Sequence, residues 1–234
     1  MREKVSVALA SYNGEKYIGR QIESILRNLS STDELIVSDD GSADDTLRVV
    51  ESFRDQRIKV VKGPGLGVKK NFENAIKNCT GKYIFLSDQD DVWMDGKVEA
   101  VLDAFQECNC PVVVHDCIVV DEEEQEIEGS FYDYRKSGPG KFKNYLKNSY
   151  VGCCMAFDSE LVKHVLPIPD DIEMHDQWIG LIGEKLGKPA FITDRLILFK
   201  RHGDNSSDPF HHYPLKRMIH NRLVLLKELL KHKI

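Results

Sequence analysis

Three aspartates lie within four residues of sequence, at Asp88, Asp90 and Asp91, directly after the apolar run Tyr83–Leu86. Carboxylates this close repel one another unless a cation lies among them, and hard oxygen ligands favour Mg²⁺ or Mn²⁺. Such a cation can act as a Lewis acid that neutralises a departing diphosphate. An aspartate-rich turn or helix start would give the same pattern without a metal, so the run alone leaves both interpretations open.

Two further polar clusters follow apolar runs, Ser11–Gly14 after the first and Asp39–Ser42 after the second. In an open α/β sheet, ligands bind outside the carboxyl ends of the strands, so we expect both clusters to converge with Asp88–Asp91 on one crevice. One of Asp39 and Asp40 is expected to accept a hydrogen bond from a pyrimidine N–H while the other holds the turn. Ordinary turn chemistry remains the alternative for both.

The glycine-rich stretch Gly63–Lys70 does not match either common phosphate-binding motif. It lacks the G-x-x-x-x-G-K-[ST] spacing, and Val68 stands where a G-x-G-x-x-G motif needs its third glycine. Lys69 and Lys70 are cations near a helix start, where lysines are usually solvated. We therefore do not predict a phosphate loop here.

Short β-rich runs alternate with helical patterns in the first half of the chain, which predicts a mostly parallel sheet flanked by helices. Apolar residues recur at helical spacing between Ile18 and Leu29, after the capping sequence Ser42–Asp45, at Phe72–Ile76 and at Val98–Phe105. The expected strands are Val5–Ala10, Leu35–Ser38, Ile58–Val61, Tyr83–Ser87 and Val112–His115.

Beyond about residue 116 the alternation is interrupted by the acidic run Asp121–Glu128 and the turn Gly138–Gly140. This composition predicts a mobile insertion, whose aromatic residues are either loop residues or a sugar-stacking surface. The aromatic residues are Phe131, Tyr132 and Tyr134. Patterning resumes with Gly152–Phe157, helices at Ser159–Val165 and His175–Leu186, and a strand at Leu196–Phe199.

The tail Pro214–Ile234 is amphipathic, with an apolar stripe and many basic residues. A core-packed stripe beneath a solvated charged face explains this pattern, and contact with a partner or an anionic membrane surface is the open alternative. The stripe is formed by Leu215, Ile219, Leu226 and Leu230.

Composition excludes some functions. The chain has 32 Lys and Arg against 38 Asp and Glu, a net charge of -6, so no general basic field would hold a nucleic acid. The first apolar run, Val5–Ala10, is too short for a signal-peptide core or a membrane span. We therefore expect a cytoplasmic protein, with peripheral contact at the inner face of the cell membrane left open.

The six cysteines are expected to be reduced thiols, because disulfides belong to oxidising compartments. Cys108-Asn-Cys110 lacks the ligand spacing of a zinc site. Cys153 and Cys154 lie in an apolar run, where packing in the core is expected.

Three segments together resemble the family-2 glycosyltransferases, most closely the bacterial rhamnosyltransferase-like members. These are Val5–Ile18, Val37–Thr46 and Tyr83–Trp93, which contains an Asp-x-Asp pattern. Their order and spacing over residues 5–93 make the likeness specific. It implies a GT-A-type fold, a nucleotide sugar donor and inversion at the anomeric carbon.

Two later segments extend the resemblance. His175-Asp176-Gln-Trp178 resembles the acidic catalytic motif of the family, with His175 in place of its first acid, which implies that Asp176 is the catalytic base. Lys200–Asn205 resembles a late segment in which a histidine, here His202, binds the metal or the diphosphate. Arg201 adjoins His202 directly, which departs from the family's spacing.

The resemblance also implies a set of binding residues. Those expected to bind the nucleotide sugar are Ala10, Tyr12, Asn13, Asp39, Asp40, Asn71, Asp88 and Asp90, and those expected to bind Mg²⁺ or Mn²⁺ are Asp90, Asp91 and His202.

The expected architecture is α/β, with a GT-A-type nucleotide-diphospho-sugar transferase fold and a C-terminal amphipathic helix. One catalytic domain would span 1–213, with a nucleotide-binding half at 1–115 and an acceptor-binding, catalytic half at 116–213. The helix would occupy 214–234.

The expected function is inverting, metal-dependent transfer of a sugar to a hydroxyl of a glycan or lipid-linked glycan, as in cell-wall, capsule or O-antigen synthesis. The likeness suggests dTDP-L-rhamnose as donor, with UDP-hexoses as competitors. Open alternatives are a nucleotidyltransferase, a protein that binds nucleotide sugars without reacting, and a Mg²⁺-dependent receiver-like signalling module.

Overall fold

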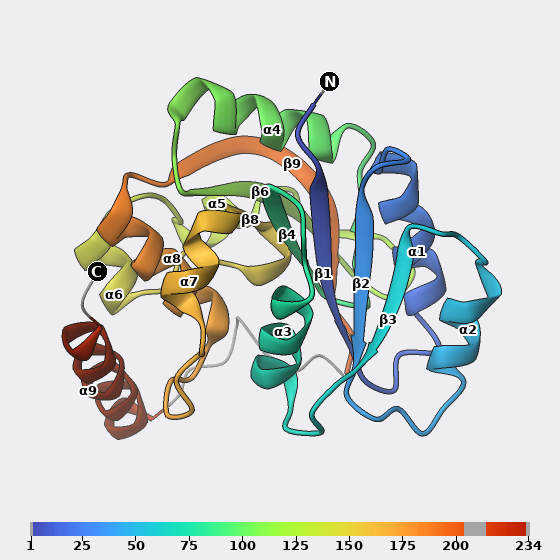
Figure 1. The fold of residues 1–234 in the computed structure, drawn as a ribbon. Coiled ribbons are helices and arrows are strands. Elements are labelled where there is room, and N and C mark those ends of the chain that lie inside the picture. Colours follow the sequence, from blue (N-terminus) through green and yellow to red (C-terminus); the bar gives the residue numbers. More distant parts are fainter. Residues whose placement is uncertain (1, 204–213, 233–234) are drawn as a thin grey trace.

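The computed structural model describes residues 2–203 and 214–232 (Figure 1). Its first half is a parallel sheet in which β1 pairs with β2 and β4, and β2 pairs with β3. Every residue of β1 and β2 is buried, as expected for central strands covered on both faces. The strands are β1 (Val5–Ser11), β2 (Glu34–Asp39), β3 (Ile58–Lys62) and β4 (Tyr83–Ser87), and the helices between them are α1 (Ile18–Asn28), α2 (Thr46–Ser52) and α3 (Val68–Lys77).

The same sheet continues through the second half of the chain. Among the described residues its strand order is β3-β2-β1-β4-β8-β6-β9-β5, with β7 paired to β6. Strand β8 runs antiparallel to β4 and β6, whereas β9 runs parallel to β6. The added elements are β5 (Val92–Trp93), α4 (Lys97–Cys108), β6 (Val112–Val120), β7 (Glu126–Glu128), β8 (Met155–Asp158) and β9 (Ala190–Lys200).

The region after residue 116 is not the mobile insertion that its acidic composition predicts. Strand β6 extends to Val120 and pairs with β7, and α5 (Phe131–Arg135) follows. Phe131 is buried and meets the Phe199 ring edge-on at 6.1 Å, and Tyr132 packs against the core, so neither is a loop aromatic. Only tertiary packing decides this, because β6 gains a parallel neighbour in β9.

The remaining helices lie beside the sheet's second half, away from β1–β3 (Figure 1). The expected helix at Ser159–Val165 divides into a 3-10 turn and a short α-helix. The elements are α6 (Lys141–Leu146), η1 (Gly152–Cys154), η2 (Ser159–Leu161), α7 (Val162–Val165), α8 (His175–Leu186) and α9 (Leu215–Lys231). No helix within 2–203 or 214–232 is long and apolar enough to cross a membrane.

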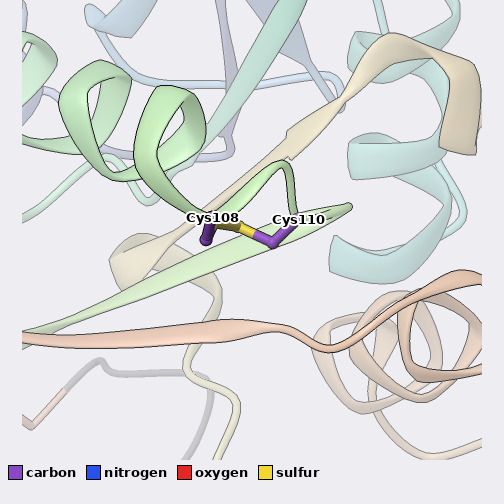
Figure 2. Close-up of a disulfide and its surroundings, with 2 residues drawn as sticks. All are labelled: Cys108 and Cys110. Carbon is purple, nitrogen blue, oxygen red and sulfur yellow. A yellow bond between two sulfur atoms is a disulfide. The ribbon is translucent and has the colours of Figure 1, made fainter.

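Cys108 and Cys110 form a disulfide at the end of α4 (Figure 2). The expectation that all six cysteines are reduced is therefore wrong for this pair. Asn109, between them, adopts the left-handed conformation that ends α4, which brings the two Cα atoms to 5.1 Å. The free cysteines are Cys79, Cys117, Cys153 and Cys154. Cys153 and Cys154 are buried as expected, and Cys117 is buried as well.

A close approach between α8 and Tyr150 generates a stability prediction. A Cβ on Gly180 would lie 2.4 Å from the buried Tyr150 ring, whose hydroxyl donates to Glu184. We expect Gly180→Ala to lower the free energy of unfolding by about 1 to 3 kcal/mol, because the clash outweighs the helix propensity gained. Urea denaturation measures this. Gly203→Ala is the control, because a Cβ there would meet no described residue within 4 Å apart from its chain neighbours. Equal losses in both variants would contradict the packing argument.

Candidate functional site

The carboxyl ends of β1, β2 and β4 meet at one edge of the sheet, as their polar clusters predict. The Asp40 backbone N–H donates to the Ser11 carbonyl at 2.9 Å. Gln89 joins β4 to β1, since its side chain accepts from the Tyr12 N–H at 3.0 Å and donates to the Tyr12 carbonyl at 3.1 Å. The three clusters therefore form a single site.

Asp39 and Asp40 both hold loops at this edge, in different places. The buried Asp39 accepts from the backbone N–H groups of Gly41 and Ser42, which makes it the aspartate that fixes the turn. Asp40 is half-buried and accepts from the N–H groups of Gly65 and Gly67 at 2.7 Å. The glycine-rich stretch is thus tied to the second strand rather than shaped as a phosphate loop.

The loop after β1 leaves one aromatic side chain exposed at the site. Tyr12 is 57% exposed, whereas Ala10 is buried inside β1. Asn13 has a positive φ of 47°, and its side-chain oxygen accepts from the Ala43 N–H at 2.8 Å. The Tyr12 ring is therefore exposed beside the ends of the strands, where a ligand could reach it.

Asn71 lies behind the strand ends. It is 2% exposed, and its amide donates to the carbonyls of Ser11 at 3.1 Å and Ser38 at 2.8 Å. A Cβ on Gly63 would come within 2.7 Å of the Asn71 side-chain oxygen. This arrangement gives Asn71 a supporting position, without showing direct contact with a nucleotide.

The acidic run separates into two groups. Asp88, Asp91 and Cys153 each offer a ligand atom, and these atoms lie within 4.8 Å of one another. Asp90 turns instead to His202, whose Nε2 lies 2.9 Å from a carboxylate oxygen of Asp90. The His202 ring stacks on Tyr17 at 4.3 Å. Asp90 and His202 are thus brought together, while Asp91 joins Asp88.

Burial and like charge make the acidic group unfavourable without a counter-ion. Burial, followed by the charges of Asp90 and Asp176, raises the pKa of Asp88 to about 7. Burial, followed by the charges of Asp90 and Asp88, holds the pKa of Asp91 well above its usual value. One carboxylate oxygen of Asp91 is buried without a hydrogen-bond partner. These residues fit a divalent cation, which would satisfy that oxygen and relieve the repulsion.

Asp176 lies in the first turn of α8 and is 5% exposed. Its carboxylate accepts from the side chain of Asn148 at 3.2 Å and from the Gln177 N–H at 2.5 Å. Burial raises its pKa to about 6, so it is ionised near neutrality yet able to take a proton. Its charge contributes to the raised pKa of Asp88, which places the two carboxyl groups in one electrostatic environment.

His175 is held beside Asp176 by packing. It is buried, and its ring stacks on Phe72 at 4.2 Å. Burial lowers its pKa to about 3, so the imidazole is neutral. A Cβ on Gly152 would lie 3.2 Å from its Nε2. His175 therefore supports the start of α8 and cannot add a positive charge there.

Lys97 is a site residue that the sequence does not single out. It is fully buried, donates to the Cys153 carbonyl at 2.9 Å and lies 4.0 Å from the Trp93 ring centroid. Burial lowers its pKa to about 8. The sequence does contain a sign of this burial, because Lys97 lies four residues before Val101 and therefore on the apolar side of α4. No pattern marks Asn148 or Cys153, which reach the site only through folding.

Comparisons with known proteins agree with this geometry. The family model "Glycosyl transferase family 2" matches residues 6–166. A β-1,3-glucosyltransferase of Escherichia coli, WfgD, which uses UDP-Glc and α-D-GlcNAc-diphosphoundecaprenol, is 30% identical over 64% of the chain and 57% of its own length. The dTDP-rhamnosyl transferase RfbG of Shigella flexneri is 34% identical over 44% of the chain and 39% of its own length.

A longer match is the putative teichuronic acid biosynthesis glycosyltransferase TuaG of Bacillus subtilis, 29% identical over 86% of the chain and 80% of its own length. The first three curated relatives are matched over only 44% to 66% of their own lengths.

Solved structures share the fold. TarS of S. aureus, in complex with UDP-GlcNAc, superposes with a TM-score of 0.77 at 18% identity, covering 99% of the chain and 68% of TarS. The mannosyltransferase PcManGT of Pyrobaculum calidifontis, in complex with GDP-Man and Mn²⁺, gives 0.67 at 17% identity, covering 100% of the chain and 66% of its own. These likenesses confirm the expected α/β, GT-A-type fold.

The raised pKa of Asp88 predicts a pH dependence of stability. The native state keeps this carboxyl protonated up to about pH 7, whereas the unfolded chain releases the proton near 3.8, so its contribution to stability falls as the pH rises between these values. In EDTA, the free energy of unfolding of the wild type should fall between pH 5 and pH 8. We expect Asp88→Asn to make this fall smaller by roughly 1 to 3 kcal/mol. Urea denaturation at both pH values measures this.

The matched control for that prediction is Asp95→Asn, because the Asp95 side chain is 84% exposed. It should keep the wild-type pH dependence. If Asp88→Asn also keeps it, Asp88 does not ionise at an unusual pH in the folded protein.

Proposed function

Because the chain belongs to glycosyl transferase family 2, we propose that it transfers a sugar from a nucleotide diphosphate donor to a hydroxyl group of a glycan precursor. The main support for this proposal is that acidic residues from the two halves of the chain lie in the same site. Asp176, at the start of α8, lies close enough to Asp88, after β4, to raise its pKa. A base for the acceptor and carboxylates for the donor are thus in one site.

The nucleoside of the donor is assigned to the ends of β1 and β2. Tyr12 offers an exposed ring for the base, and Asn13 and Asp40 border the same loops. We favour dTDP-L-rhamnose as the donor on the sequence resemblance, with UDP-hexoses as the competing class. Both nucleotides carry a pyrimidine whose N–H suits a carboxylate acceptor.

The diphosphate is assigned to the acidic run. Asp90, Asp91 and His202 would hold Mg²⁺ or Mn²⁺, and the orphaned oxygen of Asp91 supports this assignment. A bound divalent ion would supply Lewis-acid neutralisation of the departing diphosphate. The Lys200 backbone N–H donates to one Asp91 oxygen at 3.1 Å, which would fix the carboxylate for an ion held by its other oxygen.

The reaction is a direct displacement with inversion. The acceptor oxygen forms a bond to the anomeric carbon, its proton passes to Asp176, and the bond from that carbon to the diphosphate oxygen breaks. Asp176 suits this role because its pKa of about 6 lies close to the pH at which it must work. Asn148 holds the carboxylate in place through its hydrogen bond.

The acceptor is proposed to be a cell-surface glycan precursor carried on a lipid, as in O-antigen, capsule or cell-wall synthesis. Such an acceptor lies at a membrane, so the protein would work in the cytoplasm, peripherally, at the inner face of the cell membrane. Acceptor choice is assigned to the half of the chain that carries Asp176.

Donor binding is tested first by thermal stabilisation. A panel of dTDP-, UDP- and GDP-linked nucleotides with Mn²⁺ should raise Tm for one base, since a ligand that binds only the native state stabilises it. At about 100 times its Kd the ligand should stabilise by roughly 2.7 kcal/mol. EDTA or Asp90→Asn should abolish the shift, and the exposed control Asp95→Asn should keep it. No shift with any nucleotide would contradict the donor site.

Asp176→Asn tests the base. We expect transfer to fall by roughly 10²- to 10⁴-fold while donor binding persists, because only proton acceptance is removed. The wild-type rate should rise with pH through about 6, as Asp176 ionises. Single-turnover transfer and donor titration measure the two effects. Asp171→Asn, at an exposed position in the loop just before α8, is the control, and wild-type rates in Asp176→Asn would show that another group is the base.

A further inference from the structure

Helix α9 carries two apolar stripes, of which one is buried and the other open. Leu225 is 4% exposed and Leu229 packs against the core, and this stripe docks the helix on the protein. The open stripe repeats at intervals of four, four, three and four residues, which places its members on one side of the helix. It consists of Leu215, Ile219, Leu223, Leu226 and Leu230, which are 39% to 73% exposed.

Helix α6 continues this open stripe. The Arg222 guanidinium donates to the Leu146 carbonyl, and the Tyr145 hydroxyl donates to the Arg222 carbonyl at 2.9 Å, so the two helices touch. Arg222 immediately precedes Leu223 of the stripe, so α6 meets α9 beside it. Phe142 is 76% exposed, and Leu146, one turn later, is 41% exposed. We call these two side chains and the open stripe of α9 the docking face.

Basic residues surround the docking face although the whole chain is acidic. Residues 135–147 contain five Lys or Arg and no acid, and residues 215–231 contain five with one acid, Glu228, in a chain of net charge -6. Partial burial and then the charges of Arg135, Lys143 and Lys136 lower the pKa of Lys147. Within these two segments, ten basic residues therefore stand against one acid, Glu228, which pairs with Lys231.

We propose that the docking face seats on an anionic membrane surface, with its apolar side chains in the headgroup region and its lysines and arginines near the lipid phosphates. Charge complementarity selects this occupant, because an apolar stripe flanked by basic residues is the pattern of helices that lie in a membrane interface. The helix lies on the membrane rather than across it, since no helix in the described part of the chain is long and apolar enough to span one.

The two helices of the docking face also contact the segment that carries the candidate base. Asn148, just after α6, donates to Asp176, and the Gln177 side chain donates to the Asn144 carbonyl of α6 at 2.8 Å. From α9, Asn221 donates to Glu173, in the loop that leads into α8. Seating α6 and α9 on lipid would hold Asp176 near the surface where a lipid-linked acceptor lies. This consequence rests on the proposed function, whereas membrane binding itself does not.

The test is flotation of the full chain with vesicles of phosphatidylcholine alone or mixed with phosphatidylglycerol, at low and high salt. We expect binding to the mixed vesicles that weakens as salt rises. Lys143→Glu with Lys147→Glu should lower the partition coefficient by roughly tenfold or more, because each basic residue adds to the attraction of the anionic surface. Leu223→Gln with Leu230→Gln should lower it comparably.

The matched control combines Arg48→Glu with Ile127→Gln, which alters an exposed cation and an exposed apolar side chain outside the docking face. It should bind like wild type, and circular dichroism should show all three variants folded. Equal binding to both kinds of vesicle, or none to either, would overturn the proposal. So would a concentration-dependent dimer that Leu223→Gln with Leu230→Gln abolishes, because a second copy would then cover this face. If the wild-type chain binds the vesicles but transfers no sugar, the result would count against the proposed function alone.

Discussion

The cost of burying carboxylates beside one another is the constraint on which the site depends. Asp88 and Asp91 are drawn together at the end of β4, and their raised pKa values record the energy of ionising both in a poorly hydrated place. Lys97, buried nearby, supplies a partial counter-charge, although its ammonium group donates to the Cys153 carbonyl. Ionisation of both carboxyl groups is therefore unfavourable by itself, and a divalent cation bound between them would relieve the repulsion.

Holding such groups in place requires a rigid surrounding, which polar side chains provide at the strand ends. Asp39 fixes its own turn, Asp40 fixes the glycine-rich stretch, and Asn71 joins two strand carbonyls. Gln89 joins the first and fourth strands through both amide atoms. Each bond satisfies a backbone group that would otherwise be unpaired where the sheet ends. The fold itself thus fixes the side of the site that we propose for the donor.

The acceptor side is built differently, by helices that pack on one another. Asp176 sits at the start of α8, where Asn148 from the α6 side and the neutral, stacked His175 hold it. The loop before α8 is tied to α9 through Glu173, and the other end of α8 is tied to α9 because Lys185 donates to the Leu229 carbonyl. Contacts of α6 and α9 therefore reach the candidate base, and the proposed membrane docking would act on Asp176 through them.

The sequence by itself determined the alternation of strands and helices over the first hundred residues and the meeting of three polar clusters, because local periodicity and the direction of parallel strands are enough for both. It also marked Asp176 and His202 by resemblance, although Asp204 and Asn205 of the second segment lie outside the described residues. Only the tertiary structure decided that Glu126–Glu128 joins the sheet, that Asp91 lies with Cys153 while Asp90 pairs with His202, and that Cys108 bonds to Cys110. Those outcomes depend on neighbours distant in sequence or on one left-handed residue, and no local pattern encodes them.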